Sequence, residues 1–327
     1  SVKEYLGQEV VPDSGCGSWL WEPQSTNLLP YSEDFSLLNA LANAVVTSNQ
    51  IISPSGLLDA DEITFDGTLY GRVEASLSVT NGATYTISVY LKNKDLSDVT
   101  QVWIGFSQTG QGQFITITDE WQRYEITLAA NGTTEYPRIQ FSGTGSLYAW
   151  GFQTEQQSYA TSYIPTEGST NTRNQDLCTN GGSLASINST SGTLYAEIAS
   201  LTKINPSGNI TLTDGTGNNR IYIYYLIDNS ISVIYNVNST GASINNFSLA
   251  NITDQTKIAV RWGNSNVSVW INGASVLSNT TSNFLPNTLN VLSFAKPAGG
   301  VPFEGKTKAV AVWKEALSDS ELQSLTT

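Results

Sequence analysis

The sequence contains no histidine and no methionine, and only two cysteines among its 327 residues. Histidine is the commonest general base and the commonest protein ligand of metals. Its absence excludes histidine-based catalytic triads and histidine-ligated zinc sites from this chain. Paired carboxylates and oxygen-ligated Ca²⁺ remain open, because both rely on acidic side chains. Any catalytic or metal site in this sequence is therefore expected to be built from Asp and Glu.

Charge is also scarce, and most of it is negative. Charged residues make up 13% of the sequence, against roughly 25% in ordinary soluble domains. The formal net charge is −13. An acidic surface repels phosphate backbones and anionic lipids, so we expect no nucleic acid as a partner. No apolar run approaches the roughly eighteen residues of a membrane-spanning helix, so we expect no membrane insertion.

What the chain has in abundance is alternation of apolar and polar residues. Residues 71–79, 84–92 and 101–107 alternate as half-buried strands do, and similar segments recur up to residue 313. Asn-Gly and Gly-rich turns separate them. Short strands at this spacing predict an all-β fold with two tandem β-sandwiches. The exception is one short C-terminal helix, in which Ser318 and Glu321 form a capping box and Leu317 packs against Leu322.

Two segments near the ends of the first expected sandwich carry a resemblance. They are SGCGSWLWEPQSTNLLPYSEDFS, which begins at residue 14, and YAWGFQTEQQSYATSYIPTEGSTNTRNQDLC, which ends at residue 178. In order and spacing they resemble a module that recurs in virion proteins of tailed bacteriophages. The resemblance implies that this part of the chain is a jelly roll like those of carbohydrate-binding modules.

The second half resembles a different family. VSVWINGASV is similar to the strand–Asn-Gly–strand hairpin of laminin-G and concanavalin-A-like lectin domains, and KAVAVWKEALSDSELQSL is similar to their closing strand and helix. We therefore expect four segments along the chain. They are an N-terminal segment or attachment loop at 1–26, the jelly roll at 27–165, a linker at 166–184 and the lectin-like domain at 185–327.

Together the two resemblances imply a phage virion surface protein: a tail fibre, a head fibre or a capsid decoration protein, made in the host cytoplasm. Such a protein would bind host-surface polysaccharide and other virion proteins without enzymatic activity, as a homo-oligomer such as a trimer. Two alternatives stay open. One is a purely structural decoration or connector protein without glycan binding. The other is a polysaccharide-degrading enzyme, in which Glu197 would pair with Asp214 or Asp228.

The candidate glycan-binding residues are aromatic residues on the outward faces of the expected strands. By alternation, Tyr90 and Trp103 point away from the apolar face of their strands, and Phe114 shares this orientation. Trp270 lies opposite Val269 and Ile271 in the same way. An exposed aromatic ring suits stacking on the apolar face of a pyranose. The alternative is that another domain, a subunit or a loop covers these rings, and for Trp270 packing in a core or an interface is favoured.

Acidic residues and cysteines give two further predictions. Asp59, Asp61, Glu62 and Asp66 are candidate ligands for a structural Ca²⁺, as in jelly-roll carbohydrate modules, although an acidic loop without metal is the alternative and no cofactor is required. Cys16 and Cys178 lie at the two edges of the first module. A disulfide between them would stabilise the fold by about 4–5 kcal/mol. Two separate thiols, as expected in a reducing cytoplasm, are the alternative.

Overall fold

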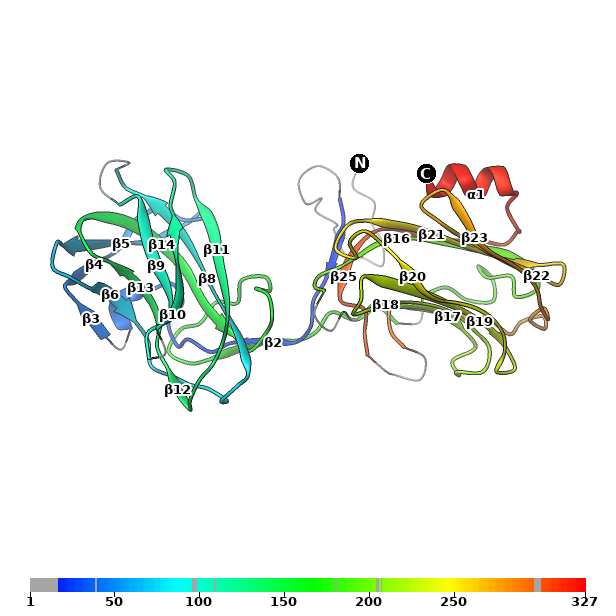
Figure 1. Cartoon of the computed structure of the whole chain (residues 1–327), viewed down its shortest axis with the longest axis horizontal. Coiled ribbons are helices and arrows are strands. Elements are labelled where there is room, and N and C mark those ends of the chain that lie inside the picture. The colour runs from blue at the N-terminus through cyan, green and yellow to red at the C-terminus, as the bar shows by residue number, and fades with distance from the viewer. Residues whose placement is uncertain are drawn as a thin grey trace. The chain divides into compact units, whose positions relative to one another are not determined.

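The computed structural model describes residues 17–38, 40–95, 99–108, 110–179, 181–203, 206, 208–296 and 301–327 (Figure 1). The chain divides into two compact units. The first sandwich is Gln24–Asn174, and the second sandwich joins the described residues before Gln24, which are 17–23, with Gln175–Thr327. Both are built from antiparallel strands, which confirms the all-β prediction. None of the described helices has the length and apolar character needed to cross a membrane.

The first sandwich consists of two five-stranded sheets, named here the β9 sheet and the β8 sheet. The strand order in the β9 sheet is β10 (Gln111–Thr116), β9 (Gln101–Phe106), β13 (Pro137–Phe141), β6 (Gly71–Glu74) and β3 (Ala40–Ala42). The order in the β8 sheet is β11 (Gln122–Ala129), β8 (Thr84–Asn93), β14 (Thr144–Glu155), β5 (Leu58–Asp66) and β4 (Ala44–Ile52). The last long strand, β14, lies between β5 and β8, so the chain crosses repeatedly between the sheets, as in a jelly roll.

The core of the first sandwich lies between these two sheets. Ile87 and Val89 of β8 and Val102 and Ile104 of β9 are buried in it, on the faces that alternation predicts. Burial of each such side chain contributes roughly 1.5–3 kcal/mol. The alternate residues face outward: Gln101 and Trp103 of β9 are exposed or partly exposed, whereas Thr86 and Ser88 of β8 are covered.

The second sandwich also has two sheets around one core. The six-stranded sheet has the order β1 (Trp19–Trp21), β25 (Gly305–Trp313), β16 (Gly192–Ser200), β21 (Thr256–Gly263), β22 (Asn266–Ile271) and β23 (Ala274–Thr280). The five-stranded sheet has the order β20 (Thr240–Ser248), β19 (Ser230–Val237), β18 (Arg220–Leu226), β17 (Asn209–Thr213) and β24 (Val291–Ser293). Trp262 of β21 is fully buried between them, and its indole N–H donates to the Ser189 carbonyl at 3.0 Å.

The α-helix α1 (Asp319–Thr326) covers the outer face of the six-stranded sheet (Figure 1). The predicted capping box is confirmed, because the Ser318 hydroxyl accepts the Glu321 N–H and the Glu321 carboxylate accepts the Ser318 N–H. Leu322 is fully buried, with Leu317 and Leu325 packed beside it. The amphipathic pattern of this short helix thus explains its position on the sheet.

The boundaries of the two units differ from the expected ones. Residues 19–21, expected in an N-terminal segment, form β1, which pairs with β25 in the second sandwich. Residues 166–174, expected in a linker, belong to the first sandwich, where β15 (Asn171–Arg173) pairs with β2 (Ser25–Asn27). Strands of three residues are too short to show alternation, and their partners are far away in the sequence. The segment 71–79, expected as one strand, is two short strands, and the second of them, β7 (Leu77–Ser78), pairs with β12 (Thr134–Glu135).

A buried hydrogen-bond network joins the entry and exit segments of the first sandwich. We call it the clasp, and its members are Asn27, Gln153, Glu155 and Thr161. Asn27 is fully buried. Its amide nitrogen donates to the carbonyls of Phe152 at 3.3 Å and Ile164 at 3.0 Å. Its amide oxygen accepts the N–H groups of Leu29 and Thr154, both at 3.2 Å.

Gln153 and Glu155 complete the clasp from β14. The fully buried Glu155 carboxylate accepts the Ser25 hydroxyl at 2.6 Å and the backbone N–H of Thr161 at 3.0 Å. The Gln153 side chain accepts the Ile164 N–H at 2.7 Å. Buried polar groups are costly unless they are paired. These residues of the TNLL, WGFQTE and SYATSYIPT segments therefore have a structural role.

Candidate functional site

Two of the predicted glycan-binding residues lie together on the outer face of the β9 sheet. Trp103 of β9 stands directly opposite Phe114 of β10 in the strand register. Phe114 is 70% exposed, and Trp103 is half-buried. We call this pair the aromatic platform. Its two side chains share a face because both alternate with residues that point into the core.

The indole of Trp103 lies over a pair of glycines. Gly105 and Gly112 are opposite each other in the register. A Cβ atom on Gly112 would overlap Cζ2 of Trp103, and one on Gly105 would lie 2.8 Å from Cη2. The six-membered ring of the indole therefore occupies the space that two side chains would fill. The ring therefore packs against the backbone of β9 and β10, and Trp103 as a whole stays partly exposed beside Phe114.

Polar side chains border the aromatic platform. Gln140 of β13 is the register neighbour of Trp103 on the side away from Phe114. Arg138 donates to the Gln140 amide oxygen at 3.0 Å and to Glu74 at 2.6 Å. These contacts hold the Gln140 amide beside the indole. Amide and guanidinium groups are suitable hydrogen-bond partners for sugar hydroxyls.

The structure does not bring Tyr90 to this platform. Tyr90 lies on β8, in the other sheet, with the Arg123 guanidinium 5.6 Å from its ring centroid. The Trp150 ring packs on it at 5.4 Å, and Tyr163 packs on Trp150 at 4.4 Å. Alternation places Tyr90 and Trp103 outward, as predicted, but on the outer faces of different sheets.

The prediction that Trp270 is an exposed stacking residue is corrected by the structure. Trp270 is only 9% exposed and packs with Leu322 of α1 and with Tyr195. The outer face of β22 is the face that the apolar side of α1 covers. Trp270 therefore serves to dock the helix, in line with the packing alternative.

The four candidate calcium ligands do not form one group. They lie on β5, where successive side chains point to opposite faces. Asp59 and Asp61 line a cavity, whereas Glu62 binds Lys94 at 2.6 Å and Asp66 accepts the Thr68 N–H at 2.8 Å. In the described part of the chain, no three Asp, Glu or Cys side chains lie close enough to hold a metal ion. These four residues do not fit a single Ca²⁺, and calcium binding by the chain stays a prediction.

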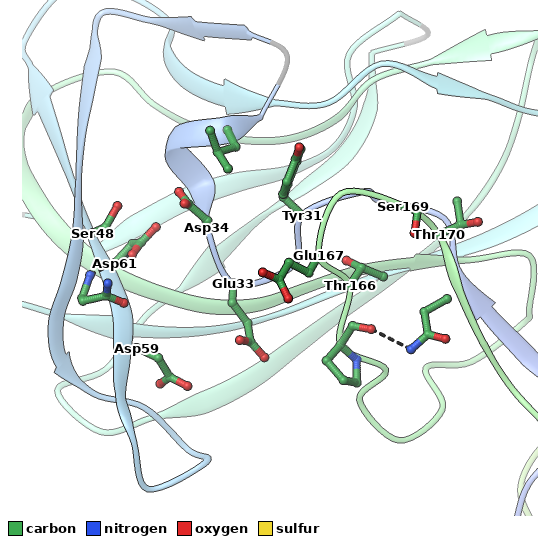
Figure 2. Close-up of a pocket in the computed structure, with 14 residues that line it drawn as sticks. Tyr31, Glu33, Asp34, Ser48, Asp59, Asp61, Thr166, Glu167, Ser169 and Thr170 are labelled. Atoms are coloured by element: carbon green, nitrogen blue, oxygen red, sulfur yellow. Dashed lines mark hydrogen bonds between the residues drawn. The ribbon is translucent and has the colours of Figure 1, made fainter.

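The cavity beside β5 has a volume of about 610 Å³ and an acidic lining (Figure 2). Its carboxylates are Glu33, Asp34, Asp59, Asp61 and Glu167. They come from the YSEDF segment, from β5 and from the exit loop of the first sandwich. We call this space the acidic cavity. Alternation could not reveal it, because three segments far apart in the sequence meet there.

Asp61 is the most deeply buried of these carboxylates, at 1% exposure. Its oxygens accept the backbone N–H groups of Phe35 at 2.8 Å and Asn49 at 3.0 Å. Burial raises the pKa of Asp61 to about 6, the two N–H bonds lower it, and the charges of Asp34 and Asp59 raise it further. Asp61 thus fixes β4 and the short 3-10 helix at Phe35–Leu37 against β5.

The carboxylates considered for an enzyme are separated. Glu197 lies on the helix-covered face of the six-stranded sheet, where it contacts Lys308 at 3.3 Å and accepts the Tyr195 hydroxyl at 3.2 Å. Asp214 and Asp228 follow strands of the five-stranded sheet. Asp214 accepts the Thr216 N–H at 2.8 Å within its own turn. This arrangement offers no facing pair of carboxylates in one cleft.

The cysteine prediction is only partly within the described residues. Cys178 is half-buried against the core of the second sandwich, and burial raises the pKa of its thiol. Cys16 lies outside the described residues. A disulfide between the two therefore stays a prediction.

Among the solved structures similar to this chain is the CBM40 domain of the Ruminococcus gnavus IT-sialidase bound to alpha2,3 sialyllactose. It has 16% identity and a TM-score of 0.36, over 42% of this chain and 83% of that one. The heptameric SAP-like pentraxin of Limulus polyphemus has 14% identity and a TM-score of 0.36, over 46% and 74%. The K499G mutant of NanB sialidase from Streptococcus pneumoniae has 16% identity and a TM-score of 0.37, over 44% and 25%. No curated protein matches the sequence significantly.

One protein family matches the chain by sequence. Residues 171–323 match the family described as the Concanavalin A-like lectin/glucanases superfamily. The match covers most of the second sandwich: the whole five-stranded sheet and every strand of the six-stranded sheet except β1. The second sandwich is therefore a concanavalin A-like domain, as its sequence predicted.

Proposed function

We propose that this chain is a non-enzymatic glycan-binding protein and that the aromatic platform is its binding site in the first sandwich. The observation that carries the proposal is the position of Trp103, packed against paired glycines and next to the exposed Phe114. Two neighbouring aromatic side chains on an outer sheet face suit stacking on the apolar face of a pyranose. Gln140 and Arg138, fixed at the border, supply hydrogen bonds that distinguish one sugar from another.

The concanavalin A-like domain supports the same function, because its family description names lectins as well as glucanases. The positions of the acidic residues favour binding over hydrolysis. A glycosidase needs two carboxylates about 5–10 Å apart across the scissile bond. Glu197 is instead held by Lys308 and Tyr195 on the sheet opposite to Asp214 and Asp228.

The sequence resemblance to phage virion modules supports a location on the virion surface, as part of a fibre or a decoration protein. In that setting the partners are host-surface polysaccharide, other virion proteins and further copies of this chain. Stacking on one shallow platform gives weak binding, but many copies on one particle raise the overall affinity by orders of magnitude. A homo-oligomer, for example a trimer, would serve this purpose.

The test is a glycan array probed with the whole chain displayed in many copies on a bead. We expect binding to a restricted set of glycans, and loss of that binding in the Phe114→Ala variant. Because Phe114 is 70% exposed, this substitution leaves the core intact. Absence of binding to any glycan by the multivalent protein would favour the alternative, a structural virion protein in which a neighbouring protein covers Phe114.

A further inference from the structure

We propose that the acidic cavity of the first sandwich binds a saccharide that carries a free amino group. This site is distinct from the aromatic platform, and the inference does not depend on glycan binding there. Five carboxylates line the cavity, and none of the described lining residues is Lys or Arg. An ammonium group would offset the uncompensated negative charge, whereas phosphates, sulfates and uronic acids would be repelled.

A second observation points to a ligand. The Thr166 side chain is 8% exposed and lines the cavity, yet its hydroxyl has no hydrogen-bond partner. Figure 2 shows Thr166 beside Glu167 on the cavity wall. A buried hydroxyl is normally paired, because leaving it unpaired costs free energy. One oxygen of Asp59, also in the lining, is buried and without a partner. A polar ligand in the cavity would satisfy both atoms.

The size and lining of the cavity favour a polar organic ligand over a metal ion. Its volume of about 610 Å³ is within the range of small-molecule sites, and far larger than an ion needs. No three carboxylates of the described chain converge on one point. Instead, acceptors are spread along the wall, with hydroxyls at Ser48, Ser169 and Thr170 among them. Spread acceptors suit a ligand that donates hydrogen bonds from several positions, as an amino sugar does.

Two carboxylates can be neutralised without disturbing the fold. The Glu167 side chain is exposed, and Glu33 only accepts the Tyr163 hydroxyl at 2.9 Å, which a Gln oxygen can also do. Glu125→Gln on β11 is a matched control, because Glu125 is exposed at the opposite edge of the β8 sheet from β4. Thr166→Val removes only the unpartnered hydroxyl, since the three hydrogen bonds between Thr166 and Ser32 all use the Thr166 backbone.

The experiment is isothermal titration with a glucosamine tetramer, and separately with its fully N-acetylated, uncharged counterpart. The Trp103→Ala chain is used, so that the aromatic platform cannot contribute. We expect binding of the amine form, and binding of the N-acetylated form weaker by at least about tenfold. The double variant Glu33→Gln/Glu167→Gln should lose about tenfold or more in affinity. Thr166→Val should lose about fivefold, and Glu125→Gln should bind as its parent does.

Three results would overturn the proposal. The first is equal affinity for the amine and N-acetylated tetramers. The second is full binding by the double variant or an equal loss in Glu125→Gln, which would show only a general response to charge. The third is binding of a lysine-rich peptide or of Ca²⁺ alone at the cavity without binding of the amino sugar. A failure of the glycan array at the platform would leave this titration unaffected, so the two proposals can fail separately.

Discussion

Replacement of Asn27 by Asp should destabilise the first sandwich far more than its small chemical change suggests. Asn27 is fully buried, and its amide nitrogen donates to the Ile164 carbonyl at 3.0 Å and the Phe152 carbonyl at 3.3 Å. In Asn27→Asp an acceptor oxygen would face both carbonyls. A buried charge left without a partner costs about 3–5 kcal/mol. The Leu29 and Thr154 N–H groups would keep their acceptor, so the loss comes from the donor side alone.

The cost should depend on pH in a defined direction. Burial and the two carbonyls would raise the pKa of the carboxyl introduced by Asn27→Asp above its value in the unfolded chain, so the folded state binds the proton more tightly. The destabilisation should therefore be smaller at about pH 4 than at neutral pH, because a protonated carboxyl can donate to one carbonyl. Hydrogen exchange in increasing urea, followed on peptides from 24–174, measures the free energy of unfolding of this sandwich.

The matched control for this variant is Gln122→Glu, the same amide-to-acid change at an exposed position of β11. Its effect should be within about 0.5 kcal/mol. A cost below about 1 kcal/mol for Asn27→Asp, unchanged with pH, would refute the role given to the clasp.

Three more predictions follow from single contacts. Gly112→Ala places a Cβ atom against Cζ2 of Trp103 and the Ile104 carbonyl. It should therefore lower the free energy of unfolding by about 1–3 kcal/mol and weaken glycan binding. Unchanged stability in urea unfolding would contradict the position of the Trp103 ring. Ser318→Ala removes the N-cap of α1 and should lower the stability by about 1 kcal/mol. Tryptophan emission should shift to the red as Trp270 becomes exposed to solvent. Emission identical to wild type at all temperatures would argue against coverage of Trp270 by α1. The pKa of Asp61 is raised to about 6, so the folded state binds this proton more tightly than the unfolded chain does. The free energy of unfolding should therefore fall as the pH rises from about 4 to about 6. Hydrogen exchange of wild type and Asp61→Asn at several pH values checks this, because the variant should lack this pH dependence of the free energy of unfolding. An equal pH dependence in both proteins would refute the raised pKa of Asp61.

Much of the fold was predictable from the sequence, for a simple physical reason. Alternation reports which face of a strand is apolar, so it placed Val89 and Ile104 in the core and Trp103 outside. A capping box is local, so the start of α1 was predictable as well. Alternation does not report what covers an outward face, however: packing was favoured for Trp270, but α1 was not identified as the element that covers it.

The candidate sites were less predictable, because they depend on register and on distant segments. The platform needs Gly105 opposite Gly112, and a shift of one residue would break this pairing. Phe114 was expected on the correct face, but not the contact of Trp103 with the glycines. The acidic cavity combines Glu33, Asp61 and Glu167, which are brought together only when the exit loop folds back on the first sandwich.

The most direct test of the central claim, glycan binding at the aromatic platform, is fluorine NMR of the chain labelled with 5-fluorotryptophan. The chain has eight tryptophans, and their resonances can be assigned with single Trp→Phe variants. Titration with a glycan found on the array should shift the Trp103 resonance in a saturable manner. The resonance of Trp270, buried beneath α1, should not move. A stationary Trp103 resonance at saturating glycan would contradict the account.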